Sequence, residues 1–174
     1  MGKQLSTKPP YGFYKDPSDA NIWRVDPDAA DVVRRIFDLT VAGKGPFEIC
    51  RILHNDKVER PAYYQTKMGY VNYSGALDAA DPYVWGMHTI TFMLARLEYA
   101  GHTVNFRSVK PSYKSKKQIQ LPPEQWLIFE NTHEPIVPQE TWDLAQKCRN
   151  VVRRTDTIGE ANPLTGLIYC GNLI

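Results

Sequence analysis

The stretch that decides the fold runs from Val25 to Leu53 and reads VDPDAADVVRRIFDLTVAGKGPFEICRIL. Asp26, Pro27 and Asp28 supply an N-cap carboxylate, a proline at the first helical position and an acid in the first turn, which together favour the start of a helix. Apolar residues then recur at spacings of three and four, as on the buried face of a helix. These residues are Ala29, Val32, Val33, Ile36 and Phe37. The sequence therefore predicts a helix that begins at Pro27.

A second helix is expected directly after the glycine turn Gly43-Lys44-Gly45. Pro46 can open it, because a proline at the first helical position sacrifices no intrahelical hydrogen bond. Its predicted buried face consists of Ile49, Cys50, Ile52 and Leu53. Two helices joined by a short turn occur both in DNA-binding helix-turn-helix units and in purely structural cores, so this pattern alone leaves both open.

Shorter elements are expected on either side of this pair. Residues 11–14 and 22–25 flank a turn-rich segment and predict a short hairpin after the extended lead-in at Pro9-Pro10. Residues 59–84 hold five tyrosines among glycine, asparagine, aspartate and proline, and are expected to form a long loop. Helical spacing returns after Gly86 and is expected to stop at Gly101. The predicted stripe of this third helix is Ile90, Met93, Leu94 and Leu97.

The last third of the chain predicts a hairpin and a fourth helix. Residues 103–106 and 126–129 are expected to pair as strands around a long tip. A helix after Pro138 should bury Trp142, Ala145, Cys148 and Val152, and the polar stretch 153–162 is typical of a linker. The predicted fold class is α+β, mainly helical, with a helix-turn-helix-like three-helix unit, short β-hairpins and a C-terminal helix.

Composition restricts the class of protein. The chain has 174 residues, and 43% of them are hydrophobic, which is enough for one core or for two small ones joined by a linker. No apolar run approaches the roughly 20 residues that span a bilayer, and the start lacks a secretory segment, so we expect a cytoplasmic protein without a membrane partner. Three widely spaced cysteines argue against a disulfide framework.

The charge distribution is more informative than the net charge of +2. Residues 1–60 are balanced, with ten Lys/Arg against nine Asp/Glu, whereas residues 107–117 hold five basic residues and no acid. The basic residues are Arg107, Lys110, Lys114, Lys116 and Lys117. Such a stripe can be a solvated loop or a phosphate-binding element, and its composition does not decide between them.

Several short motifs in a fixed order point to a family. They are Pro10-Tyr11-Gly12-Phe13, Val25-Asp26-Pro27 through Ala30, Val33 through Phe37, Gly43-Lys44, Glu48-Ile49, Leu53, Trp85, Thr89-Ile90, Met93-Leu94, Tyr99-Ala100-Gly101, Asn131 through Val137 and Glu140-Thr141-Trp142. In this order they resemble the recombinase domain of large serine recombinases, the site-specific integrases and transposases of phages and mobile elements. The resemblance covers almost the whole chain, and its order argues against a chance match.

The resemblance implies a division of the parent protein. Catalysis in this family belongs to a preceding domain with a nucleophilic serine, so residues 1–10 are expected to be the linker from that domain. Residues 11–155 would be the DNA-binding domain, and residues 156–174 a linker and the truncated start of a zinc ribbon that opens at Cys170. We therefore expect neither catalytic residues nor a cofactor in this part of a bacterial or phage-encoded enzyme, with zinc held by the ribbon that follows.

Two pairs of potential metal ligands have simpler interpretations. Asp26 and Asp28 are accounted for by the start of the first helix. Cys50 and His54 lie four residues apart, but nothing near them supplies further ligands, so we interpret them as a core cysteine and a surface histidine. No metal site is expected from these residues.

The implied partner is double-stranded DNA, which the domain would bind so that the parent enzyme is placed on attachment sites for integration or excision. The third helix would enter the major groove, and the 107–117 stripe would contact phosphates. The predicted DNA-binding residues are His88, Thr89, Thr91, Phe92, Arg96, Arg107, Lys110, Lys114, Lys116 and Lys117. Phe92 could contact a thymine methyl group or complete the core.

Two other functions stay open at this stage. One is a protein-interaction module that supports recombinase assembly, although contacts with other recombinase subunits are expected from regions outside this chain. The other is an operator-binding helix-turn-helix regulator, which would need a dimerisation element, and the chain has no heptad stretch long enough to provide one.

Overall fold

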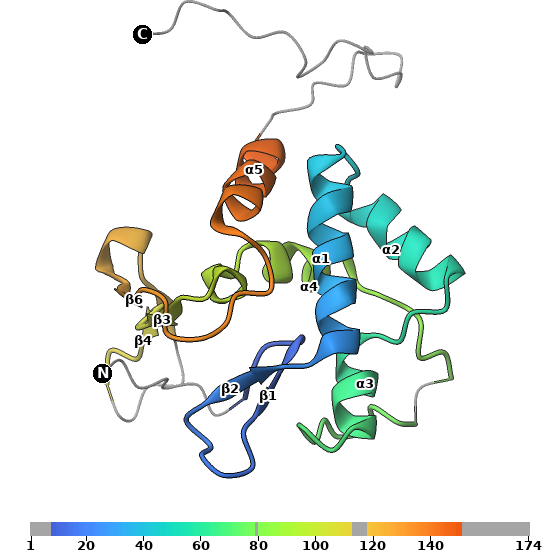
Figure 1. Ribbon diagram of the computed structural model, residues 1–174, viewed down its shortest axis with the longest axis horizontal. Coiled ribbons are helices and arrows are strands. Elements are labelled where there is room, and N and C mark those ends of the chain that lie inside the picture. The colour runs from blue at the N-terminus through green and yellow to red at the C-terminus, as the bar shows by residue number, and fades with distance from the viewer. Residues whose placement is uncertain (1–7, 79, 113–117, 151–174) are drawn as a thin grey trace, which may run out of the picture.

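The computed structural model describes residues 8–78, 80–112 and 118–150, and has the predicted α+β class. The α-helices are α1 (Pro27–Val41), α2 (Pro46–Asn55), α3 (Pro61–Lys67), α4 (Met87–Leu94) and α5 (Gln139–Asn150). The strands are β1 (Phe13–Lys15), β2 (Trp23–Val25), β3 (Thr103–Asn105), β4 (Ser108–Val109), β5 (Ile119–Gln120) and β6 (Leu127–Phe129). Two short 3₁₀ helices are η1 (Leu97–Ala100) and η2 (Pro123–Gln125). In Figure 1, α1 lies between α5 and α2, and α4 passes behind it.

The N-terminal half follows the sequence prediction. β1 and β2 pair as an antiparallel hairpin with Phe13 opposite Val25. The Asp26 carboxylate accepts the N-cap hydrogen bond from the Ala29 amide at 3.5 Å, and Pro27 occupies the first turn of α1. Pro46 opens α2 as expected. The helix-turn-helix-like pair is therefore confirmed, and its geometry is set by caps and prolines that the sequence displays.

The core lies where α1, α2 and α4 meet the first hairpin and η1. The buried residues of the predicted stripes are Ala29, Val33, Ile36, Phe37, Ile49, Cys50, Leu53, Ile90, Met93 and Leu94, whereas Val32, Ile52 and Leu97 are only partly buried. At its centre is Tyr99 of η1, whose ring stacks on Phe13 at 6.1 Å between centroids and meets Phe37 edge-on at 6.0 Å. These contacts tie the hairpin, α1 and η1 to one aromatic cluster, which fixes the segment that follows α4.

The prediction of an unbroken loop over residues 59–84 is wrong, because α3 forms within it. Pro61 takes the first helical position, and the helix is held by polar contacts together with the Tyr64 ring, which packs edge-on against Tyr11 at 5.7 Å between centroids. Gln65 is buried and its Nε2 donates to the Pro9 carbonyl at 3.4 Å, while the Tyr64 hydroxyl donates to Asp26 at 3.0 Å. A seven-residue helix whose buried face includes a glutamine carries no apolar period, so its pattern could not be recognised.

The third predicted helix is shorter than expected. α4 ends at Leu94, and η1 follows before Gly101, which adopts the left-handed φ of 91° that ends the segment. Side chains of α5 donate hydrogen bonds to two backbone carbonyls at this break. Trp142 Nε1 donates to Arg96 O at 3.0 Å, and Gln146 Nε2 donates to Leu94 O at 2.8 Å. The helix can therefore stop early without leaving buried acceptors unpaired.

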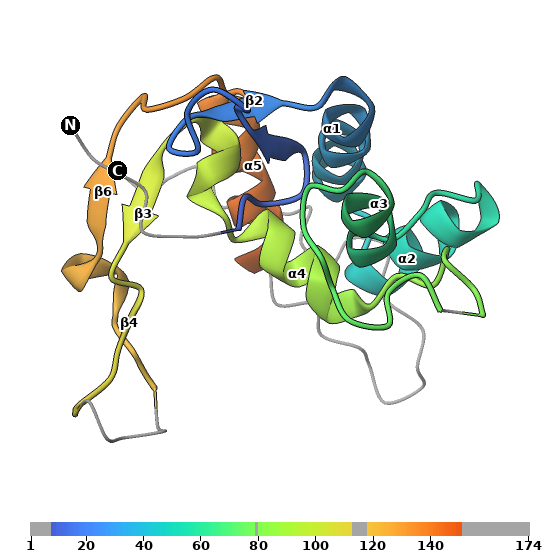
Figure 2. The ribbon, with the colours of Figure 1, turned by 90° about the horizontal axis from the view of Figure 1, so that it is seen from below.

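The predicted second hairpin and last helix are confirmed. β3 pairs with β6, and β4 with β5, to form an arm that extends from the helical body (Figure 2). Its predicted basic tip, with Lys114, Lys116 and Lys117, lies outside the described residues, as do Val152 and the predicted linker and ribbon start after it. α5 begins after Pro138 and buries Ala145, whereas Trp142 and Cys148, which were also expected to be buried, are only partly so. Within the described ranges, no helix is both long and apolar enough to cross a membrane.

Candidate nucleic-acid interface

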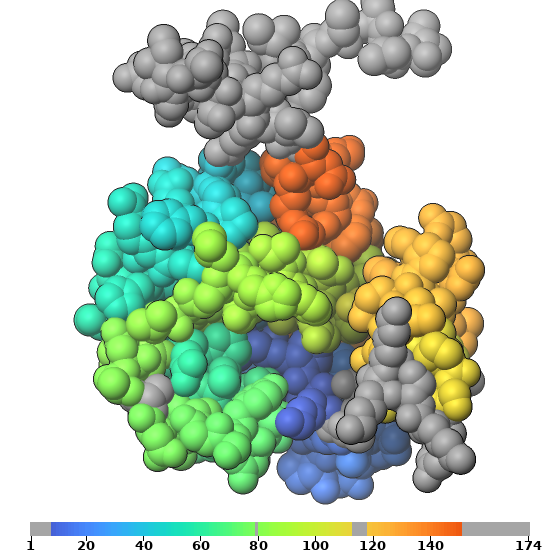
Figure 3. Space-filling model, turned by 180° about the vertical axis from the view of Figure 1, so that it is seen from behind, coloured from blue at the N-terminus to red at the C-terminus, as the bar shows by residue number. Residues whose placement is uncertain are grey.

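The outward side of α4 is free of protein contacts that would bury it. His88, Thr91 and Phe92 are exposed, and Thr89 is half-buried. Phe92 keeps 53% of its surface exposed, and its ring contacts only the neighbouring His88 ring among the aromatic pairs described, at 4.5 Å between centroids. Of the two roles considered for Phe92, completing the core is therefore excluded. Figure 3 shows α4 running across the middle of this face.

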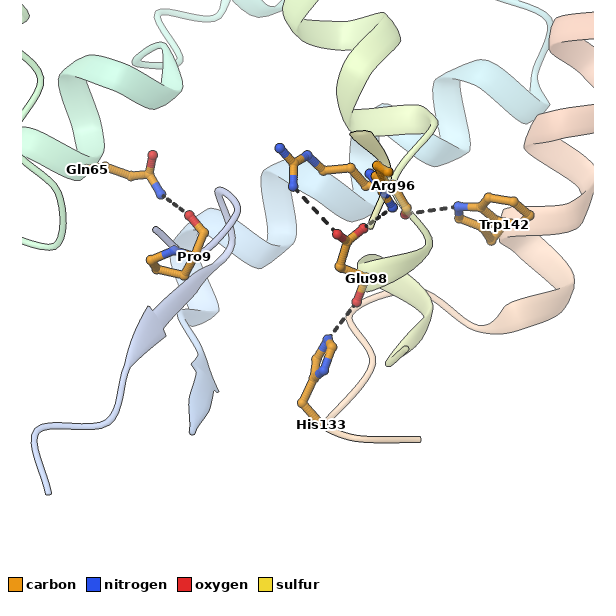
Figure 4. Close-up of polar contacts among 7 residues, drawn as sticks. Pro9, Gln65, Arg96, Glu98, His133 and Trp142 are labelled. Atoms are coloured by element: carbon orange, nitrogen blue, oxygen red, sulfur yellow. Dashed lines mark hydrogen bonds and ion pairs between the residues drawn. The ribbon is translucent and has the colours of Figure 1, made fainter. Parts of the chain in front are cut away.

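Arg96 and Arg107 share one carboxylate. Glu98 is only 8% exposed at its side chain, and its Oε2 accepts from Arg107 Nη2 at 2.8 Å, while its Oε1 lies 3.8 Å from Arg96 Nη1 (Figure 4). The Arg107 guanidinium also lies over the Trp126 ring at 5.1 Å. Burial lowers the pKa of Arg107, but a guanidinium still remains charged at neutral pH. The Arg107–Glu98 pair thus joins η1, which follows α4, to the arm.

The remaining predicted hairpin cations are placed differently. Lys110 is exposed just after β4. The other three lysines of the stripe lie outside the described residues, so the prediction of phosphate contacts by the tip stays a prediction. Ser108, at the base of the tip, accepts a hydrogen bond from Gln118.

The clefts that border α4 are cationic. Four of them touch α4 or its N-cap Gly86, and their described lining includes no aspartate or glutamate, although the chain has 19 such residues. Their basic lining residues are Lys8, Lys44, Arg51, Arg60, Arg96 and Arg149, with His54 and His88. Lys44, His54 and Arg96 pair with carboxylates that lie outside this lining. A lining that presents basic and no acidic side chains still favours the approach of a polyanion.

Two of these cations were not found from the sequence. Arg60 precedes α3, and Arg149 lies near the end of α5, where its Nη2 donates to Thr91 O at 3.4 Å. No local pattern links these positions, because they converge only through packing of distant elements.

Metal ligands do not gather in the described parts of the chain. No three His, Cys, Asp or Glu side chains within residues 8–78, 80–112 and 118–150 lie close enough to hold an ion. Cys50 is buried, which raises the pKa of its thiol, and His54 bonds to Asp81 at 3.0 Å. The expectation of a cofactor-free domain stays a prediction.

His133 makes the stability of the arm's attachment dependent on pH. Its Nε2 donates to the Glu98 carbonyl at 2.7 Å, and its ring packs edge-on against Phe13 at 5.0 Å. Burial lowers the pKa of His133 below its ordinary value of 6.5. The folded protein therefore binds fewer protons than the unfolded chain below that value, and the free energy of unfolding should decrease as the pH falls through about 6.5.

Urea unfolding at pH values on either side of this window measures the effect. We expect His133→Gln, which keeps a donor but does not titrate, to flatten the decrease. The exposed His88→Gln is the matched control and should leave the pH dependence as it is in the unaltered chain. An identical slope for the unaltered chain and His133→Gln would contradict this assignment.

The comparisons with known proteins agree with this architecture. The model of the family described as Recombinase matches residues 27–150, from the start of α1 to the end of α5. The match covers more than half of the chain, so the chain belongs to the Recombinase family. The resemblance to the recombinase domain of large serine recombinases is thereby confirmed. None of the curated proteins matches the chain.

Two solved structures show distant similarity. One is a chain of a crystal structure of an LSR–DNA complex, with a TM-score of 0.49 and 16% identity, covering 94% of this chain and 40% of that one. The other comes from a structure on the sequence requirements of the Listeria innocua prophage attP site, with a TM-score of 0.46 and 16% identity, covering 87% of this chain and 47% of that one. The chain thus spans less than half the length of either.

Proposed function

We propose that this chain is the sequence-specific double-stranded DNA-binding domain of a large serine recombinase, which positions the parent enzyme on attachment sites for integration or excision. Membership of the Recombinase family supports the class. The observation that carries the proposal is the surface around α4, where an exposed helix is bordered by clefts with basic and no acidic lining residues. An operator-binding regulator would not account for the family match as directly, and an interaction module would not account for the basic lining of these clefts.

The geometry suits reading from the major groove. α4 has eight residues, a length of about 12 Å at 1.5 Å per residue, comparable with the roughly 12 Å width of that groove. His88 and Thr91 can hydrogen-bond to base edges, and Phe92 can contact a thymine methyl group. Thr89 and Arg96 lie at the edge of this face, nearer to the phosphates. Affinity without sequence preference would come from Arg107, Lys110 and the lysines of the tip at 114, 116 and 117.

The same proposal assigns catalysis, zinc binding and subunit contacts to other regions of the parent enzyme. We assign no catalytic residue to this chain, and the serine that cuts DNA would belong to another region of the parent enzyme. Zinc would be held by a ribbon that begins near Cys170, and contacts between recombinase subunits would come from regions outside this chain.

Selection from a duplex library tests the proposal. The complete 174-residue chain is incubated with duplexes randomised at their centres, and bound DNA is amplified over several rounds. We expect one sequence to be enriched, and fluorescence anisotropy should then show tighter binding to it than to a scrambled duplex. Both affinities should fall as salt rises, because bound cations release counterions from the phosphates. A chain that ignores every duplex even in dilute buffer would instead favour the interaction module.

A further inference from the structure

A groove runs along the side of α4 that faces α3. Two adjacent clefts of about 400 and 490 Å³ form it, and they share the lining residues Pro61, Gln65, Tyr73 and Thr89. We call this the α3–α4 groove. Its basic residues are Arg60 at one end and Lys8 and Arg96 at the other. Figure 3 shows the surface hollowed between α4 and the green α3 segment.

The walls of the groove are held in place by buried hydrogen bonds. Gln65, only 3% exposed, joins α3 to the lead-in through Pro9 (Figure 4). Trp85 Nε1 donates to the Val58 carbonyl at 2.9 Å, which fixes the segment before α4. Lys8 lies over the Tyr73 ring at 4.7 Å. The groove is therefore formed before any ligand arrives, so little entropy is lost on binding.

Arg60 is the cation in this groove whose protein partners are incomplete. Its Nε atom is buried and has no hydrogen-bond partner, and no carboxylate among the described residues pairs with it. Arg24 and Arg34, in contrast, each form an ion pair, with Asp16 and Asp31 respectively. A buried donor without an acceptor costs about 1–3 kcal/mol, so the protein does not fully satisfy this guanidinium. The Arg60 side chain as a whole is only half-buried and lines the groove, so the rest of the guanidinium is available to an anionic ligand.

We infer that the α3–α4 groove binds the sugar–phosphate backbone of one strand of the duplex that α4 reads, with Arg60 in contact with a phosphate. A helix in the major groove lies between two strands, so a surface directly beside α4 meets a backbone. The groove offers cations, a fixed shape and no acidic residue to that strand. This inference rests on the proposed function and gives the tyrosine-rich segment 59–84 a role in it.

The test compares Arg60→Gln with Arg24→Gln, a control at the exposed position of β2, in the complete chain. Arg60→Gln should weaken binding to the enriched and the scrambled duplex by the same factor, because phosphate contacts carry no sequence information. The slope of log Kd against log salt should fall by about 0.9 for one lost phosphate contact. Arg24→Gln should change neither quantity. Circular dichroism confirms that each variant is folded.

Neutral methylphosphonates, placed singly along both strands of the enriched duplex, locate the contact. One such substitution, beside the bases read by α4, should weaken binding by the unaltered chain. The same substitution should not further weaken binding by the Arg60→Gln variant. If Arg60→Gln does not fold, Arg60→Lys serves instead. The same methylphosphonate should then reduce the affinity of the Arg60→Lys variant by a smaller factor than it reduces the affinity of the unaltered chain. An unchanged salt slope and an unchanged phosphate map overturn the inference while leaving the proposed function intact. If the unaltered chain binds no duplex, both fail.

Discussion

A chain that carries Thr91→Ala together with Phe92→Ala will still bind duplex DNA but will lose most of its preference for the enriched sequence. Both side chains are exposed on the outward side of α4, and neither supports the core. A good base contact contributes about 1–3 kcal/mol of discrimination, so the ratio of specific to scrambled affinity should fall by roughly 10- to 100-fold. The salt slope should stay unchanged, because no cation is removed. Anisotropy titrations of both duplexes measure the ratio.

The control for this pair is Leu144→Ala. Leu144 is an exposed apolar residue of α5, 47% accessible, and it lines none of the four clefts beside α4. Its loss should leave both affinities as they are. If the Thr91/Phe92 variant keeps the full preference for the enriched sequence, α4 is not the reading element, whatever the chain as a whole binds.

Replacing Glu98 by alanine should have the largest effect on stability. The substitution leaves Arg107 next to the core without its carboxylate, and the side chain of Arg107 is only 26% exposed. Removing one member of a buried ion pair costs roughly 3–5 kcal/mol, and we expect about 3 kcal/mol because Arg107 keeps some access to water. Urea unfolding of the complete chain gives this free energy directly.

Two further variants separate the charge of Glu98 from its size. Glu98→Gln keeps hydrogen-bond acceptance and should be less damaging than Glu98→Ala. Glu124→Ala, at an exposed position of η2, should leave the free energy of unfolding unchanged within about 0.5 kcal/mol. Equal stability of Glu98→Ala and the unaltered chain would mean that the shared carboxylate does not hold the arm to α4.

The sequence predicted those elements whose ends and buried faces are determined by residues within the element itself. Asp26, Pro27 and Pro46 mark helix starts that the structure confirms, and the apolar stripes between them lie in the core. α3 was missed because its stability comes from Gln65 and Tyr64 bonding to residues far away in the chain. The early end of α4 was missed for the same reason, since the side chains that complete it come from α5.

The candidate site could likewise be predicted only in part from the sequence. The outward side of α4 follows from helical spacing, which correctly placed His88 and Thr91 at the surface, whereas the exposure of Phe92 was left open until the structure showed it. Spacing could not show that Arg107 turns back to Glu98, because burial of that carboxylate depends on how η1 packs. Helical spacing also could not show that Arg60 lies beside α4, because this neighbourhood depends on the packing of α3 against the lead-in.

The way α5 completes α4 has a consequence for recognition. Two turns of free helix are unstable in water, because nucleation outweighs so few hydrogen bonds. Trp142 and Gln146 offset this instability. They donate hydrogen bonds to the carbonyls of Arg96 and Leu94 at the end of the helix, which keeps the short helix formed in the absence of any ligand. The contact surface is thus preorganised by a neighbour, and evolution can alter the amino acids on its outward side without having to preserve their helix propensity.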